Sequence, residues 1–174
     1  RHPPQLVVTD SQAFERVATT TPPDVPLTSF SILFSRYRGD LVTQAVGALA
    51  IGDLRPGDAV LVAEACTHHP GEDDIGRMKI PRWLAERAGG GLNITTAQGH
   101  DFPTDLSRWR LVILCGGCML NRREVLNRIA RCRDAGVPVT NYGLAIAYCL
   151  GILTVSYTHL RAHETPEHLV CRLL

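Results

Sequence analysis

The chain has 174 residues, of which 45% are hydrophobic and 20% charged, so it can bury a hydrophobic core and form one domain or two small ones. Its 18 basic and 17 acidic side chains give a formal net charge of +1, which offers no electrostatic reason to expect binding to nucleic acid or to an anionic membrane. The longest apolar run, at 144–153, is too short to span a bilayer, and the first residues lack a signal-peptide pattern. We therefore expect a cytoplasmic protein.

Residues 1–57 predict a small α/β unit. Its expected elements are helices at 9–18, 30–39 and 41–54 and strands at 5–8 and 25–29. Thr9 or Asp10 would cap the first helix, and the turn RPGD after the last helix marks a boundary. Because the first strand begins only five residues into the chain, we expect a fragment of a longer protein.

After residue 57 the pattern becomes regular. The expected elements are strands at 59–65, 92–97, 110–115 and 137–142 and helices at 80–90, 119–136 and 143–153. The strand at 110–115 is almost wholly apolar, as in a strand buried on both faces. Alternating strands and helices predict an α/β fold, a Rossmann-like parallel sheet with flanking helices and right-handed crossovers.

Three cysteines follow two of these strands. Cys66 comes directly after the strand at 59–65, and Cys115 and Cys118 lie at the end of the strand at 110–115. The carboxyl ends of parallel strands form one edge of a sheet, where open α/β sheets bind their ligands. Cys118 also lies at the expected start of a helix, whose N–H groups favour a thiolate. Three converging thiols indicate a metal site rather than a lone dithiol.

The spacing alone leaves the metal open. His68, His69, Glu72, Asp73 and Asp74 follow Cys66 and add candidate ligands. A Cys-x-His motif with a Cys-x-x-Cys motif suits a tetrahedral zinc site, and three thiolates with one exchangeable ligand suit an iron–sulfur cluster. If these residues have no role at a metal, His69 is a hydrogen-bonding loop residue, and Glu72 and Asp74 belong to a solvated acidic turn. A redox-active Cys-x-x-Cys pair is the third alternative.

Several longer stretches resemble one family. ACTHHP, EDDIGRMKIPRWL, CGGCMLNRREVLNRI and AGVPVTNYGLAIAY resemble the C-terminal cluster-binding domain of HydF, the [FeFe]-hydrogenase maturation GTPase family. LVVTDSQAF and DVPLTSFSILFSRYRGDL resemble the dimerisation domain that precedes it. The resemblance runs from about residue 4 to residue 153. It implies a partial dimerisation domain at 1–57 and a [4Fe-4S] cluster-binding domain at 58–153.

The resemblance also implies a ligand set. Cys66, Cys115 and Cys118 would be the three cysteine ligands of the [4Fe-4S] cluster, and the fourth ligand would be His68 or Asp73. The family often has histidine directly before the Cys-x-x-Cys motif, whereas this chain has Leu114, which cannot be a ligand.

The function implied by the resemblance is that of a scaffold or carrier. Such a protein receives a diiron precursor of the hydrogenase active site, made with two radical-SAM maturases, and delivers it to apo-[FeFe]-hydrogenase. The family also implies a homodimer. The family's GTP-binding loop, GxxxxGK[ST], does not occur in this sequence, so we expect this chain to be no enzyme by itself. A structural zinc domain is the main alternative, and a thiol oxidoreductase is a weaker one.

The end of the sequence loses the family pattern. Residues 154–174 resemble a non-native tail, and we expect them to be non-native or disordered. The tail carries His159, His163, His168 and Cys171, none of which we expect to be functional. Cys132 and Cys149 lie within apolar helical patterns, so we expect them to pack in the core.

Overall fold

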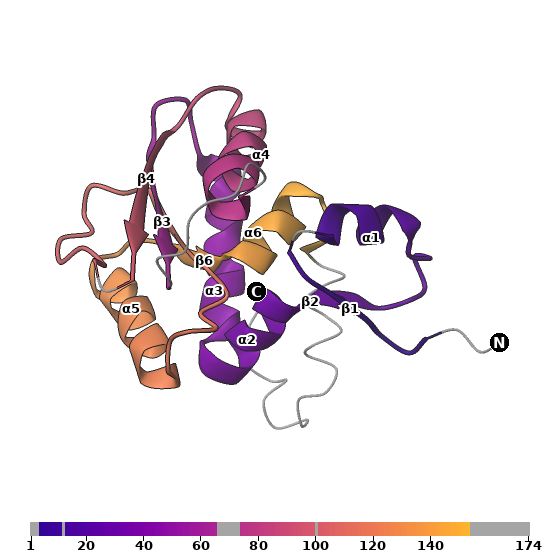
Figure 1. Cartoon of the computed structure of the whole chain (residues 1–174). Helices are drawn as coiled ribbons and strands as arrows, with labels where there is room; N and C mark the ends of the chain where they lie inside the picture. Colours follow the sequence, from indigo (N-terminus) through magenta and orange to yellow (C-terminus); the bar gives the residue numbers. More distant parts are fainter. Residues whose placement is uncertain (1–3, 12, 66–73, 100, 154–174) are drawn as a thin grey trace.

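The computed structural model describes residues 4–11, 13–65, 74–99 and 101–153 (Figure 1). Its centre is a four-stranded sheet in the order β4-β3-β5-β6, in which every neighbouring pair is parallel. The strands are β3 (Ala59–Glu64), β4 (Asn93–Gln98), β5 (Leu111–Leu114) and β6 (Val139–Asn141). This confirms the predicted α/β fold with a parallel sheet.

The two faces of the sheet pack into two separate hydrophobic clusters. Val60 and Val62 of β3 belong to one cluster, and Leu61 and Ala63 belong to the other. This alternation follows from the two-residue period of a strand. All four residues of β5 are buried, as expected for a central strand with helices over both faces.

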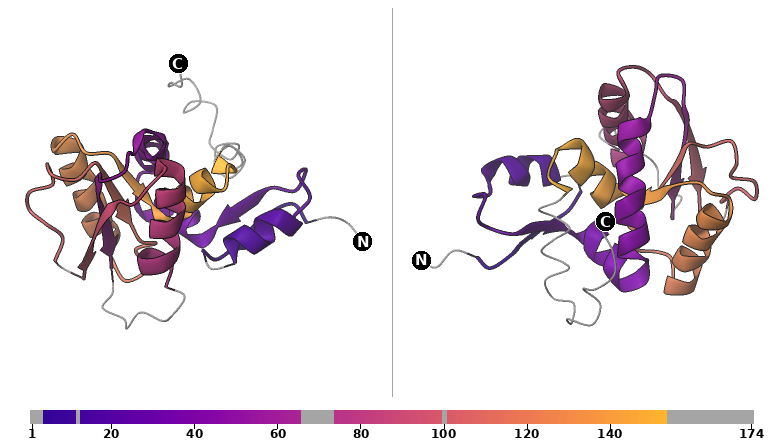
Figure 2. Two further views of the ribbon diagram at one scale, coloured as in Figure 1. Left: turned by 90° about the horizontal axis from the view of Figure 1, so that it is seen from above. Right: turned by 180° about the vertical axis from the view of Figure 1, so that it is seen from behind.

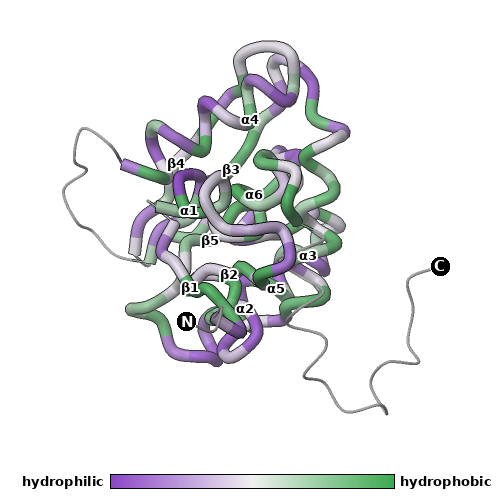
Figure 3. Tube along the Cα trace, turned by 90° about the vertical axis from the view of Figure 1, so that its right-hand side faces the viewer, coloured by the Kyte–Doolittle hydropathy of each residue, from purple (hydrophilic) through white to green (hydrophobic). Residues whose placement is uncertain are grey.

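Helices cover both faces (Figure 2). One cluster includes residues of α3 (Leu41–Leu49), α4 (Ile80–Ala88) and α6 (Tyr142–Cys149), and the other includes residues of α5 (Arg122–Asp134). Figure 3 shows hydrophobic residues along α6, whose residues from Tyr142 to Ala147 are all buried. Within the described ranges, no helix is long and apolar enough to cross a membrane.

A second, two-stranded sheet lies to one side of the first (Figure 1). It pairs β1 (Val7–Thr9) with β2 (Leu27–Ser29) in parallel, and α1 (Phe14–Thr20) connects them. The helix predicted to start at residue 9 starts at Phe14 because Val7–Thr9 belongs to the strand. The Asp10 carboxylate accepts a hydrogen bond from the Ala13 backbone N–H at 2.7 Å, which stabilises the turn before α1.

The chain then forms α2 (Phe30–Arg38), α3 and a short 3₁₀ turn, η1 (Ala50–Asp53). Asp40 caps α3 through a 3.0 Å hydrogen bond to the backbone N–H of Thr43. Leu41 of α3 belongs to the same hydrophobic cluster as Val60 of β3, so residues before and after position 57 share one core. The predicted domain boundary after residue 57 stays a prediction, and the predicted tail at 154–174 lies outside the described residues.

The close approach of α3 to β6 depends on Gly47. A Cβ atom at this position would lie 2.0 Å from the backbone oxygen of Val139. We predict that Gly47→Ala lowers the free energy of unfolding by about 2 kcal/mol or more, because the helix must move away from the strand. Gly91→Ala is the control, since a Cβ there meets no atom within 4 Å. Urea unfolding of both variants tests this, and equal midpoints would contradict it.

Candidate metal centre

The parallel pairing of β3 and β5 brings Cys115 beside the end of β3. Ala63 lies opposite Leu114 in the register, and the Cys115 backbone N–H donates to the Ala63 carbonyl at 2.9 Å. Ala65, the first residue after β3, donates its N–H to the Cys115 sulfur at 3.0 Å. Ala65 is bonded directly to Cys66. The sheet thus holds Cys115 next to Ala65, the residue that precedes the predicted ligand Cys66 in the sequence.

The Cys115 sulfur is half-buried and accepts a second N–H, that of Gly117, at 3.4 Å. Backbone N–H groups directed at a sulfur stabilise negative charge on it, and thiolates are the form in which cysteines bind metal. The site of Cys115 therefore suits a metal-bound thiolate.

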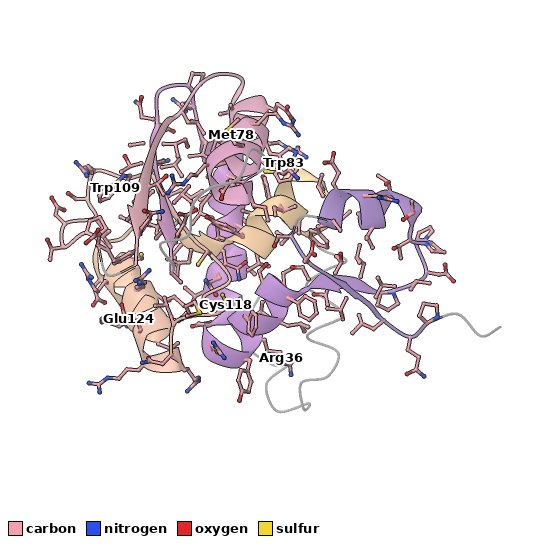
Figure 4. The ribbon with its side chains drawn as sticks, in the orientation of Figure 1. Arg36, Met78, Trp83, Trp109, Cys118 and Glu124 are labelled. Carbon is pink, nitrogen blue, oxygen red and sulfur yellow. The ribbon has the colours of Figure 1, made fainter. Side chains whose placement is uncertain are left out.

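The CGGC loop, residues 115–118, turns at Gly117. This residue has a φ of +67°, a left-handed conformation that favours glycine, and its carbonyl accepts the Leu120 N–H at 3.0 Å. Cys118 is exposed and lies between α2 and α5 (Figure 4). Cys118 is a free thiol, so its sulfur is available as a ligand.

The helix after this loop starts later than predicted. It was expected from residue 119, but α5 starts at Arg122 and its cap is Asn121, whose side chain accepts the Glu124 N–H at 2.9 Å. The left-handed turn at Gly117 delays the helix. The expectation that Cys118 lies at the start of this helix was therefore wrong.

The rest of the predicted ligand set lies outside the described residues, namely Cys66, His68 and Asp73, and so do His69 and Glu72. In the described ranges no three His, Cys, Asp or Glu side chains gather as a metal site. Leu114 is buried in the cluster on the α5 side of the sheet, which fits its expected lack of a ligand role. Asp74 is buried and accepts the Arg77 N–H at 2.9 Å as the cap of η2 (Ile75–Lys79), so it is no solvated turn residue.

Sequence reasoning missed a buried polar group at this edge of the sheet. Glu64, the last residue of β3, is 3% exposed and forms an ion pair with Arg77 at 3.5 Å. It also accepts hydrogen bonds from Gln98 at 3.1 Å and from the Tyr142 hydroxyl at 3.4 Å. The signal in the sequence was the single charge at the end of the apolar strand AVLVAEA.

Tyr142 keeps its proton in this network. Burial raises the pKa of its hydroxyl, and the nearby Glu64 and Cys115 raise it further. The protonated hydroxyl donates to the Glu64 carboxylate. The turn η2 packs closely on this pair, because a Cβ at Gly76 would lie 2.0 Å from the Tyr142 hydroxyl oxygen. The network thus fixes the chain on one side of the segment 66–73.

The two other described cysteines belong to the core. Cys132 is fully buried in the α5 cluster, and Cys149 packs against the opposite cluster. Burial raises the pKa of Cys132 to about 12 and that of Cys149 to about 11. Both are protonated packing residues, as predicted, and neither is a candidate ligand.

Two protein-family models match the sequence of this chain. Residues 42–158 match the model of the hydrogen maturase F tetramerization domain, and residues 1–39 match that of the hydrogen maturase F dimerization domain. The first match alone spans more than half of the chain. The chain belongs to the HydF family. No curated protein matches it.

Membership of the HydF family implies a part in hydrogenase maturation, and the two matched domains support self-association. Both matches are to association domains and neither is to a GTPase domain. The candidate metal centre at Cys115 and Cys118 lies within the HydF tetramerization match, whereas α2 lies within the dimerization match.

The buried network of this HydF chain should contribute to stability through Glu64. We predict that Glu64→Ala lowers the free energy of unfolding by about 2–3 kcal/mol, because Arg77 and the Tyr142 hydroxyl lose their buried acceptor. Glu64→Gln keeps the shape and part of the hydrogen bonding, so its effect should be less than half as large.

Glu86→Ala serves as the control in the same urea-unfolding series. Glu86 forms an exposed pair with Arg82, and exposed pairs contribute about 0.5 kcal/mol or less. If Glu64→Ala lowers the free energy of unfolding no more than the control does, the network does not make the predicted contribution to stability.

The raised pKa of Cys132 predicts a loss of stability in alkali. An unfolded thiol ionises near pH 9.0, whereas the folded Cys132 ionises only near 12. The neutral Cys132 thiol therefore makes its full contribution to the free energy of unfolding below pH 9. This contribution falls as the pH rises from 9 towards 12, by on the order of 1 kcal/mol per pH unit. Unfolding free energies measured at several pH values between 8.5 and 10 should show a flatter slope for Cys132→Ala than for the unsubstituted chain. Identical slopes would mean that Cys132 does not contribute.

Proposed function

We propose that this HydF-family chain holds a [4Fe-4S] cluster on Cys66, Cys115 and Cys118, with His68 or Asp73 as the fourth ligand. The observation that carries the proposal is the Cys115 sulfur, which accepts two backbone N–H groups at the carboxyl edge of a parallel sheet. One of these N–H groups belongs to Ala65, the residue bonded to Cys66. The donor set is three thiolates, which suits iron–sulfur ligation.

The described thiols differ in their surroundings, and this difference supports a carrier role. Cys115 is half-buried and held by hydrogen bonds, whereas Cys118 is exposed and is followed by Met119, which is 73% exposed. One side of the site is thus anchored in the sheet edge, and the other faces solvent. When bound, the cluster would supply an iron position that can exchange its ligand. The anchored cysteine would keep the cluster in place while a diiron precursor binds and leaves.

We further propose that the chain passes this diiron precursor to apo-[FeFe]-hydrogenase and works with two radical-SAM maturases in the cytoplasm. Self-association through the matched domains supports an assembly of several copies, with a homodimer as its basic unit. GTP binding and hydrolysis would belong to the GTPase domain of full-length family members.

Anaerobic reconstitution with iron and sulfide tests the cluster. We expect a paramagnetic cluster after reduction, detected by electron paramagnetic resonance, with about four irons per chain. Cys66→Ser, Cys115→Ser and Cys118→Ser should each abolish it or lower its yield at least about tenfold, because each removes a ligand. Cys132→Ala is the matched control, since it removes a thiol that is buried in the core.

Two outcomes would replace the proposal with an alternative. Uptake of stoichiometric zinc alone, with no chromophore, would indicate a structural zinc domain on the same residues. Disulfide exchange that needs Cys115 and Cys118 but tolerates Cys66→Ala would indicate a thiol oxidoreductase.

A further inference from the structure

The carbonyl oxygens of the CGGC loop and of the residues just after it converge on one side chain of α2. The Nη1 atom of Arg38 lies 3.4 Å from the Gly117 oxygen, 3.1 Å from the Cys118 oxygen and 3.2 Å from the Leu120 oxygen. These residues are separated from Arg38 by 79 to 82 positions in the sequence. The contact therefore joins two distant parts of the chain at the candidate metal centre.

Arg38 is itself held in place by α2. Its guanidinium lies over the Phe34 ring, 5.2 Å from the centroid, one helical turn earlier. The loop packs on the same helix, because a Cβ at Gly116 would lie 3.8 to 3.9 Å from Ser31 and Phe34. Ser29 caps the start of α2, and α2 contacts both α5 and α6. The loop therefore packs against a helix that is itself held in place by α5 and α6.

The hydrogen bonds to Arg38 also fix the direction of the loop's peptide groups. In a trans peptide the N–H points opposite to the C=O. When the Gly117 and Cys118 carbonyls point at Arg38, the N–H groups of Cys118 and Met119 therefore point away from it. The N–H of Gly117 itself reaches the Cys115 sulfur. Arg38 thus fixes the Gly117 carbonyl, in the peptide group that directly follows the N–H donor to the Cys115 sulfur.

We propose that Arg38 is a positioning residue of the metal centre: it holds the CGGC loop so that Cys115 and Cys118 keep the spacing that a metal requires. Arg38 lies in the segment that matches the dimerization domain, whereas the loop lies in the tetramerization match. The site on the second segment is therefore incomplete without a residue of the first. The loop-holding role stands on the hydrogen bonds alone, and its effect on cluster binding rests on the proposed function.

Arg38→Met tests the role because it keeps much of the aliphatic stem and removes the donors. Arg38→Lys is the conservative variant, and Arg123→Met is the matched control. Arg123 is exposed in the first turn of α5, and its side chain makes no hydrogen bond or ion pair within the described ranges. The control removes the same charge near the loop without removing a contact to it.

Hydrogen exchange of the metal-free chain is the first readout. We expect the amides of residues 116–121 to exchange about tenfold faster in Arg38→Met, with those of β3 and β5 unchanged. Arg38→Lys should restore most of the protection, and Arg123→Met should match the unsubstituted chain. Equal exchange in Arg38→Met and the unsubstituted chain would overturn the proposal. So would faster exchange throughout the sheet in both Arg38 variants, because it would indicate a general role in folding.

The second readout is the reconstituted cluster. In Arg38→Met we expect iron to pass to a chelator at least about fivefold faster, and the resonance of the reduced cluster to broaden. Faster loop exchange with no cluster in any variant, the unsubstituted chain included, would refute the proposed function and leave the positioning role standing. A cluster that is equally stable in Arg38→Met would refute the role of Arg38 at the metal centre.

Discussion

The parallel pairing of β3 with β5 is the constraint on which the candidate metal centre depends. It places Ala63 opposite Leu114 and so brings Ala65 to the Cys115 sulfur, although the two residues are 50 positions apart. Register matters because a shift of one residue turns every side chain of a strand to the other face. The buried alternation of Val60, Leu61, Val62 and Ala63 between two hydrophobic clusters fixes that register. The core thereby determines where the thiol lies.

The same alternation bears on the fourth ligand. Leu114 packs in the cluster on the α5 side, whereas Cys115 packs against the opposite cluster. A leucine at position 114 contributes to the core of the sheet and offers no ligand atom. If a protein ligand completes a site at Cys115, the segment between β3 and η2 is the natural source. This reasoning supports the proposal of His68 or Asp73, both of which belong to that segment.

Much of this arrangement could be predicted because it follows from local pattern. The apolar runs at 59–65 and 110–115 are strands, and the alternation of strands with helices gave the parallel sheet. The start of α5 could not be located, since it depends on a left-handed glycine and an asparagine cap that act against the apolar pattern. The partners of long-range side-chain contacts left no local signal. The hydrogen bonds of Arg38 to the CGGC loop and of Tyr142 to Glu64 join residues 78 or more positions apart.

The segment 66–73 is joined at both ends to fixed structure. On one side Ala65 donates to the Cys115 sulfur, and on the other Asp74 caps η2, which packs on the Glu64–Tyr142 pair. Fixing the two ends of a short segment lowers the entropy that it loses when its side chains bind a ligand. The buried Glu64 therefore helps to hold η2, which begins directly after Asp74, against the end of β3. Arg38 contacts the CGGC loop in a comparable way, so polar contacts from other elements flank both segments that carry the proposed ligands.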